Sequence, residues 1–91
     1  MQEAYGVAAF RSRQQVMRFE QILRRFGVPV SVISTPRDIS MGCGLSVRFP
    51  LNRAQDVRRA LRTIDTNNLI GLYRAEYDRA RLRVTPLRQR N

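Results

Sequence analysis

The sequence contains no histidine, no lysine and no tryptophan, and one cysteine among its 91 residues. Without histidine the chain cannot form a Ser-His or Cys-His catalytic pair, an imidazole metal site or the usual proton switch near neutral pH. One cysteine excludes an intramolecular disulfide, which a small secreted domain normally needs. We therefore expect a protein of the reducing cytoplasm with no metal and no cofactor, and we expect a non-catalytic role more than an enzymatic one.

The sequence also lacks long apolar runs. None approaches the roughly 20 residues that span a bilayer. The first ten residues, MQEAYGVAAF, contain an acid and no basic leader, so we do not expect a signal peptide. A length of 91 residues, with 43% hydrophobic and 26% charged residues, fits one small globular domain and no contact with a membrane.

Acidic residues are scarce, and all 17 basic residues are arginine, so the seven acidic residues leave a formal net charge of +10. Residues 78–91 hold five of these arginines and one aspartate. This segment therefore carries +4 and has few apolar positions, which predicts a loosely ordered C-terminal extension. The remaining residues, 1–77, are expected to form a single domain with a net charge of +6.

Hydrophobic periodicity predicts four strands and two helices. Alternating or β-branched segments predict strands at residues 4–10, 28–34, 45–49 and 69–77. Apolar residues at steps of three and four predict helices at residues 12–26, capped by Ser12, and from residue 51 or 52 to about residue 64. The order β-α-β-β-α-β predicts a ferredoxin-like α+β fold, an antiparallel sheet with two helices on one face. We expect Phe19, Phe26 and Phe49 in its core, and one wetter face on strand 45–49.

The connection at residues 35–44, TPRDISMGCG, shows no sustained period and contains the only cysteine, Cys43. It is longer than a usual hairpin connection, which makes it a candidate functional loop. Gly42 and Gly44 leave space beside the thiol for another protein or form an anion-binding nest of backbone amides. Arg37 and Arg48 lie nearby in the sequence, and positive charge beside a thiol favours the reactive thiolate.

Each of these residues also has a simpler interpretation. A lone cysteine is often a small buried hydrophobic residue. The two glycines equally fit ordinary turn geometry. Arg48 fits a solvated strand position paired with a carboxylate. These alternatives stay open on the sequence alone.

The segment Ser34 to Phe49, STPRDISMGCGLSVRF, has a recognisable order of residues. Proline is followed by Arg, an acid, Ile and Ser, then by Cys-Gly, an apolar stretch and Arg-Phe. This order resembles the selenium or sulfur carrier protein-like family of small bacterial proteins, and the resemblance extends over about residues 4 to 77. It implies that Cys43 accepts a persulfide or selenopersulfide from a donor, such as a cysteine desulfurase, and passes it to an acceptor protein.

Two other functions remain open. A basic ferredoxin-like sheet is also the architecture of RNA-recognition domains. Those domains need aromatic residues on the central strands, whereas LSVRF offers one aromatic residue at its end, so nucleic acid is the less favoured partner. The second possibility is an interaction module or homo-oligomer that pairs through an edge strand, the second or the fourth.

Overall fold

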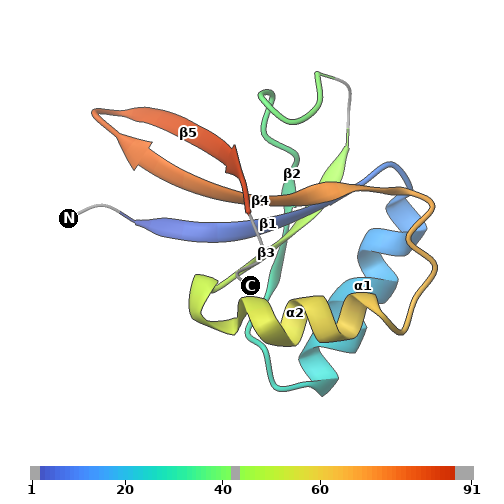
Figure 1. Cartoon of the computed structure of the whole chain (residues 1–91). Helices are drawn as coiled ribbons and strands as arrows, with labels where there is room; N and C mark the ends of the chain where they lie inside the picture. Colours follow the sequence, from blue (N-terminus) through green and yellow to red (C-terminus); the bar gives the residue numbers. More distant parts are fainter. Residues whose placement is uncertain (1–2, 42–43, 88–91) are drawn as a thin grey trace.

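The computed structural model describes residues 3–41 and 44–87. In these ranges the chain folds into a five-stranded antiparallel sheet with two α-helices, and the strand order is β2-β3-β1-β4-β5. Both helices lie on the same face of the sheet (Figure 1). The elements are β1 (Ala4–Phe10), α1 (Arg13–Arg25), β2 (Ser31–Ser34), β3 (Leu45–Phe49), the short 3-10 helix η1 (Leu51–Arg53), α2 (Ala54–Leu61), β4 (Leu69–Asp78) and β5 (Arg81–Pro86).

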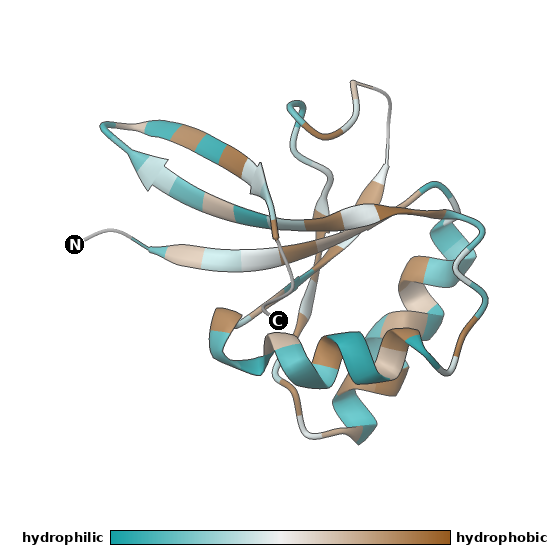
Figure 2. Ribbon diagram, viewed as in Figure 1, coloured by the Kyte–Doolittle hydropathy of each residue, from teal (hydrophilic) through white to brown (hydrophobic). Residues whose placement is uncertain are grey.

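The predicted α+β class is confirmed, but the predicted β-α-β-β-α-β order is incomplete because β5 follows β4. β5 pairs with β4 from Tyr73 opposite Pro86 to Asp78 opposite Arg81. In Figure 2, β5 alternates between hydrophilic and hydrophobic residues along its length, as expected for a strand with one covered face. The prediction of a loosely ordered extension is therefore wrong for residues 81–86.

The turn between β4 and β5 has an unusual composition. Its two central residues, Arg79 and Ala80, have φ angles of 52° and 67°. Two-residue hairpin turns with both φ angles positive normally contain Asn-Gly or Asp-Gly. The sequence Asp-Arg-Ala-Arg lacks that signal, so the turn residues alone do not predict this hairpin.

We expect an Ala80→Gly variant to be more stable than the wild type. Glycine adopts positive φ without the steric cost that a Cβ atom imposes, which is about 1 kcal/mol. A gain of about 1 kcal/mol corresponds to a rise in Tm of roughly 4–8 °C in a domain of this size. Thermal unfolding followed by circular dichroism measures the shift. A lower Tm than that of the wild type would show that the turn is not strained.

Helix α1 forms where the periodicity predicts it. The Ser12 side chain accepts a hydrogen bond from the backbone N–H of Gln15 at 3.3 Å, and so caps the first turn. Gly27 ends the helix with a φ of 78°, a conformation that favours glycine. Phe26, which we expected in the core, is 39% exposed because it is the C-cap residue, beyond the last helical turn.

Two other elements are shorter than predicted. β2 covers only Ser31–Ser34 of the predicted strand 28–34. The second helix consists of η1 followed by α2, which ends at Leu61. No helix in the described residues is long and apolar enough to cross a membrane.

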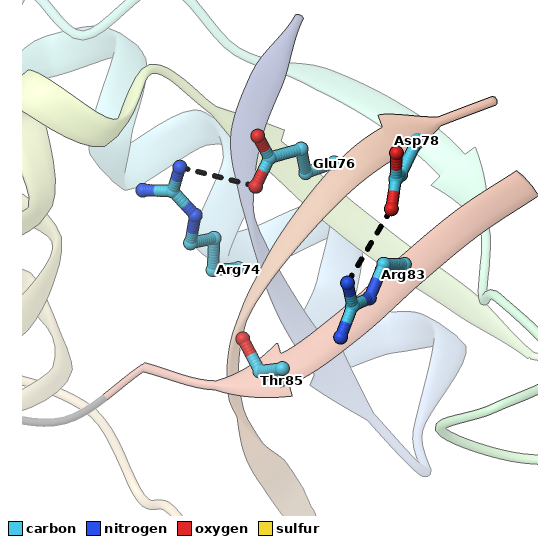
Figure 3. A pocket seen from close by; sticks show the side chains of 5 residues that line it. All are labelled: Arg74, Glu76, Asp78, Arg83 and Thr85. Atoms are coloured by element: carbon cyan, nitrogen blue, oxygen red, sulfur yellow. Dashed lines mark hydrogen bonds and ion pairs between the residues drawn. The ribbon is translucent and has the colours of Figure 1, made fainter. Parts of the chain in front are cut away.

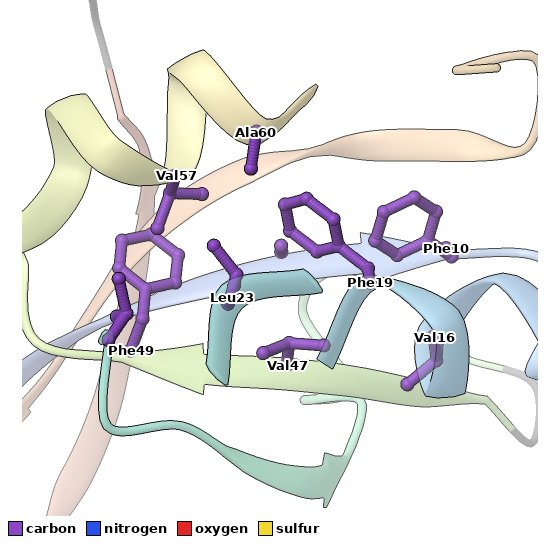
Figure 4. Packing of buried hydrophobic residues seen from close by; sticks show 10 residues of the cluster. Phe10, Val16, Phe19, Leu23, Val47, Phe49, Val57 and Ala60 are labelled. Atoms are coloured by element: carbon purple, nitrogen blue, oxygen red, sulfur yellow. The ribbon is translucent and has the colours of Figure 1, made fainter. Parts of the chain in front are cut away.

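The main core fills the space between the helices and the sheet (Figure 4). The Phe10 and Phe19 rings pack at a tilted angle of 58° with centroids 5.4 Å apart, a favourable aromatic geometry. Phe19 and Phe49 are both buried, as predicted. The other fully buried side chains of this core include Val16, Leu23, Val47, Val57 and Ala60.

The helix-free face of the sheet carries a second apolar cluster. Its buried members are Tyr5, Val7 and Ala75. Partly buried residues from distant segments pack against them, namely Ile33, Ile39, Tyr73, Leu82 and Val84. The prediction of a wetter face on strand 45–49 holds for Arg48, whose side chain is 42% exposed, and is wrong for Ser46, which is fully buried.

Candidate functional site

The segment between β2 and β3, which contains the predicted site, is held at both ends. The backbone N–H of Thr35 donates to the carbonyl of Gly44 at 3.0 Å. The hydroxyl oxygens of Thr35 and the fully buried Ser46 lie 2.7 Å apart. A Cβ atom at Gly44 would lie 3.2 Å from the Thr35 Oγ1 atom. A side chain at Gly44 would therefore crowd the Thr35 hydroxyl that contacts Ser46.

The first half of this segment forms a turn on the helix-free side of the sheet. The backbone N–H groups of Ile39 and Ser40 donate to the Pro36 carbonyl at 3.0 and 3.2 Å. Ile39 then packs against the cluster of Tyr5, Val7 and Ala75. Because one side chain is anchored in this way, the turn is fixed against the sheet instead of extending into solvent.

Two of the predicted site residues, Gly42 and Cys43, lie outside the described residues. Arg37 lies in the turn and is exposed. Met41, the last described residue before the thiol in the sequence, is 92% exposed. The structure therefore places exposed side chains on the segment that leads to Cys43, and the role of the thiol itself stays a prediction.

Arg48 makes its contacts elsewhere. Its guanidinium carbon lies 3.9 Å from the centroid of the Tyr5 ring. One of its nitrogens lies 3.3 Å from a carboxylate oxygen of Glu3. Arg48 is three residues beyond Leu45, where β3 begins, so its Cα atom lies about 10 Å along the strand from the Cα atom of Leu45. These contacts favour the simpler interpretation of Arg48, a strand arginine paired with a carboxylate.

The environment of Tyr5 affects its titration. Burial raises the pKa of Tyr5 above its usual value of 10.0, and nearby Tyr77 and Glu3 act in the same direction, while Arg48 lowers it. The folded state therefore holds the phenol proton more tightly than the unfolded state does. The resulting stabilisation is fully present below pH 10 and is lost as the pH rises through the pKa of the folded state.

We expect a Tyr5→Phe variant to lose less stability than the wild type when the pH rises above about 10. Phenylalanine keeps the ring beneath Arg48 but removes the hydroxyl that must ionise. Urea unfolding at pH 8 and at several pH values above 10 measures the difference. An equal loss of unfolding free energy in both proteins at high pH would show that Tyr5 does not contribute to it.

The hairpin of β4 and β5 forms a polar groove of about 340 Å³, which the sequence prediction missed because it assigned β5 to a loose extension (Figure 3). Arg74 and Glu76 form an ion pair at 3.2 Å, and Arg83 and Asp78 form another at 3.4 Å. Thr85 completes the lining. Because each arginine has a carboxylate partner, the groove offers no excess charge to a ligand.

In residues 3–41 and 44–87, no group of three or more histidine, cysteine, aspartate or glutamate side chains could hold a metal ion. The described ends of the predicted site, Thr35 and Gly44, are joined by a backbone hydrogen bond.

Comparison with known proteins identifies the family. The family model described as "Putative Se/S carrier protein-like" matches residues 5–70, a range that includes Cys43. No curated protein and no solved structure matches the chain. The matched range is more than half of the chain and agrees with the resemblance around Cys43. The chain therefore belongs to the Se/S carrier protein-like family.

Proposed function

We propose that the protein carries sulfur or selenium as a persulfide or selenopersulfide on Cys43 and delivers it to a partner protein. The observation that carries the proposal is the family match over residues 5–70, which includes the only thiol of the chain. A carrier of this kind works in a reducing compartment such as the cytoplasm, where its thiol stays free.

The transfer needs no oxidant or cofactor. The Cys43 thiolate attacks the outer sulfur of a persulfide on a donor protein, such as a cysteine desulfurase. A sulfur–sulfur bond forms at Cys43, the donor's own sulfur–sulfur bond breaks, and the donor cysteine leaves as a thiolate. Delivery repeats the same exchange, with a thiolate of the acceptor protein as the attacking group. Selenium follows the same course as a selenopersulfide.

The surrounding residues suit an exchange between two proteins. The contacts of Thr35 with Gly44 and Ser46 hold the ends of the segment, so the segment keeps its place when a partner approaches. We propose that Met41, with its 92% exposed side chain, offers the partner an apolar contact. Gly42 and Gly44 are proposed to leave room for the partner. We propose that Arg37, the arginine of this segment, favours the thiolate form of Cys43.

The test is transfer from a cysteine desulfurase supplied with cysteine, followed by intact mass spectrometry. We expect the wild type to gain the mass of one sulfur atom, the gain to disappear after treatment with dithiothreitol, and a Cys43→Ser variant to gain nothing. A second arm supplies selenium in place of sulfur and measures which atom is loaded faster.

A short peptide with the sequence MGCGL is the matched control, because it has the same thiol and the same glycines without the fold. We expect the protein to accept sulfur faster than the peptide. Equal rates would show that any exposed thiol reacts in this way, and no mass gain on the wild type would exclude the carrier role.

A further inference from the structure

The positive charge of the protein is concentrated on one layer. We define the helix layer as residues 11–28 and 51–65, which contain α1, η1 and α2. These residues include nine arginines and three acidic residues, a formal net charge of +6. The rest of the described chain has six arginines and four acidic residues, a net charge of +2. The net charge of +6 that the sequence analysis assigns to residues 1–77 therefore lies mainly on the helix layer.

A groove of about 510 Å³ runs between α1 and the turn that follows α2. Arg18 and Arg25 line it from α1, seven residues apart, which places them about 10 Å apart along the helix axis. Asp65 is the one acidic residue in the lining, and its carboxylate accepts hydrogen bonds from the backbone and side-chain nitrogens of Asn67 at 2.9 and 3.3 Å. The remaining lining residues are Gln15, Gln21, Ile22, Thr63 and Ile64.

One buried polar atom of this groove lacks a partner. The Gln15 Nε2 atom donates to the Asp65 carbonyl at 3.2 Å. The Gln15 Oε1 atom is buried and has no hydrogen-bond partner among the described residues. Because this atom has almost no exposed surface, a bound ligand does not reach it. The groove instead offers a ligand the guanidinium groups of Arg18 and Arg25.

We propose that the helix layer binds the phosphate backbone of a nucleic acid. Arg18 and Arg25 contact phosphates along one strand. Arginine suits this role because its planar guanidinium binds phosphate through two parallel hydrogen bonds. The net charge of +6 on the helix layer complements a polyanion, in which phosphates repeat along the chain.

This surface is not the one that RNA-recognition domains use. Those domains stack bases on the sheet, whereas here Ile39 and the β4–β5 hairpin cover the helix-free face. The helix layer and residues 35–41 lie on opposite sides of the sheet (Figure 1). Nucleic acid binding on the helices would therefore leave residues 35–41 accessible to another protein.

The test measures the fluorescence anisotropy of a labelled 20-nucleotide oligouridine over a series of salt concentrations. We expect the Arg18→Gln/Arg25→Gln variant to bind about tenfold or more weakly at 0.1 M salt. The slope of log K against log salt should fall by about 1.4, or about 0.7 for each phosphate that an arginine no longer neutralises. The same titration with a labelled DNA duplex compares the affinity of the protein for DNA with its affinity for RNA.

The Arg79→Gln/Arg81→Gln variant is the matched control, because it removes the same charge from the hairpin. We expect it to bind within about twofold of the wild type. Equal losses of affinity in the two double variants would overturn the proposal, since only overall charge would then matter. Tighter binding of polyglutamate than of oligouridine would overturn it in favour of an acidic protein partner. All variants retain Cys43, so sulfur loading tests the carrier role separately.

Discussion

A Gly6→Ala variant is expected to lose about 3 kcal/mol of unfolding free energy, the upper part of the range for overpacked cores. Gly6 on β1 lies opposite Phe49 on β3. A Cβ atom at Gly6 would lie 2.7 Å from the Phe49 Cδ2 atom and closer still to Cε2 and Cζ. The ring cannot move away easily, because Phe49 is 1% exposed and packed within the main core.

Urea unfolding of four proteins tests this prediction as a double-mutant cycle. The proteins are the wild type, Gly6→Ala, Phe49→Leu and the double variant. Because leucine leaves space where the ring edge lies, the added methyl group should cost less in the Phe49→Leu background. A cost below about 0.5 kcal/mol in the wild-type background would match an ordinary surface substitution. That result would contradict the close packing of the ring on Gly6.

The elements that local sequence determines were predictable. The apolar spacing of Val16, Phe19 and Leu23 and the Ser12 cap correctly indicate α1. Strands β1 and β3 have the predicted bounds. These features depend on residues a few positions apart, so they are visible in a single sequence.

The features that were missed depend on contacts between distant segments. β5 is a strand because its side chains Leu82 and Val84 cover Val7 and Ala75, although its turn residues give no hairpin signal. Ser46 is buried because Thr35, eleven residues away, binds it. Nothing in the local pattern of these residues shows which distant segment will cover them.

The candidate site also has a part that the local sequence indicates and a part that depends on contacts between distant segments. The residue order around Cys43 was sufficient to indicate the family, and the match over residues 5–70 confirms it. The proposed help from Arg48 was inferred from its closeness in sequence alone. In the structure, Arg48 pairs instead with Glu3, 45 residues away in the sequence, and with the Tyr5 ring. Closeness in sequence is a poor guide here because a strand carries its residues away from the loop before it.

Truncation after Asp78, which removes residues 79–91, is expected to destabilise the protein by about 3 kcal/mol or to prevent folding. The truncation removes β5, so β4 loses its pairing on that side from Tyr73 onward and keeps only its pairing with β1. It also removes Leu82 and Val84 from the cluster of the helix-free face. Full burial of such a side chain contributes about 1.5–3 kcal/mol, and small domains have only about 5–15 kcal/mol in total.

Truncation after Leu87 is the matched control. It keeps β5, the hydrogen bond from the Leu87 N–H to the Leu72 carbonyl at 2.9 Å, and the hydrogen bond from Arg58 to the Leu87 carbonyl at 3.2 Å. We expect its unfolding free energy in urea to stay within about 0.5 kcal/mol of the full chain. If the Asp78 truncation were equally stable, β5 would be dispensable and residues 1–78 would form a domain that folds without the C-terminal segment. The expected loss would instead show that this domain needs its fifth strand to cover the face opposite the helices.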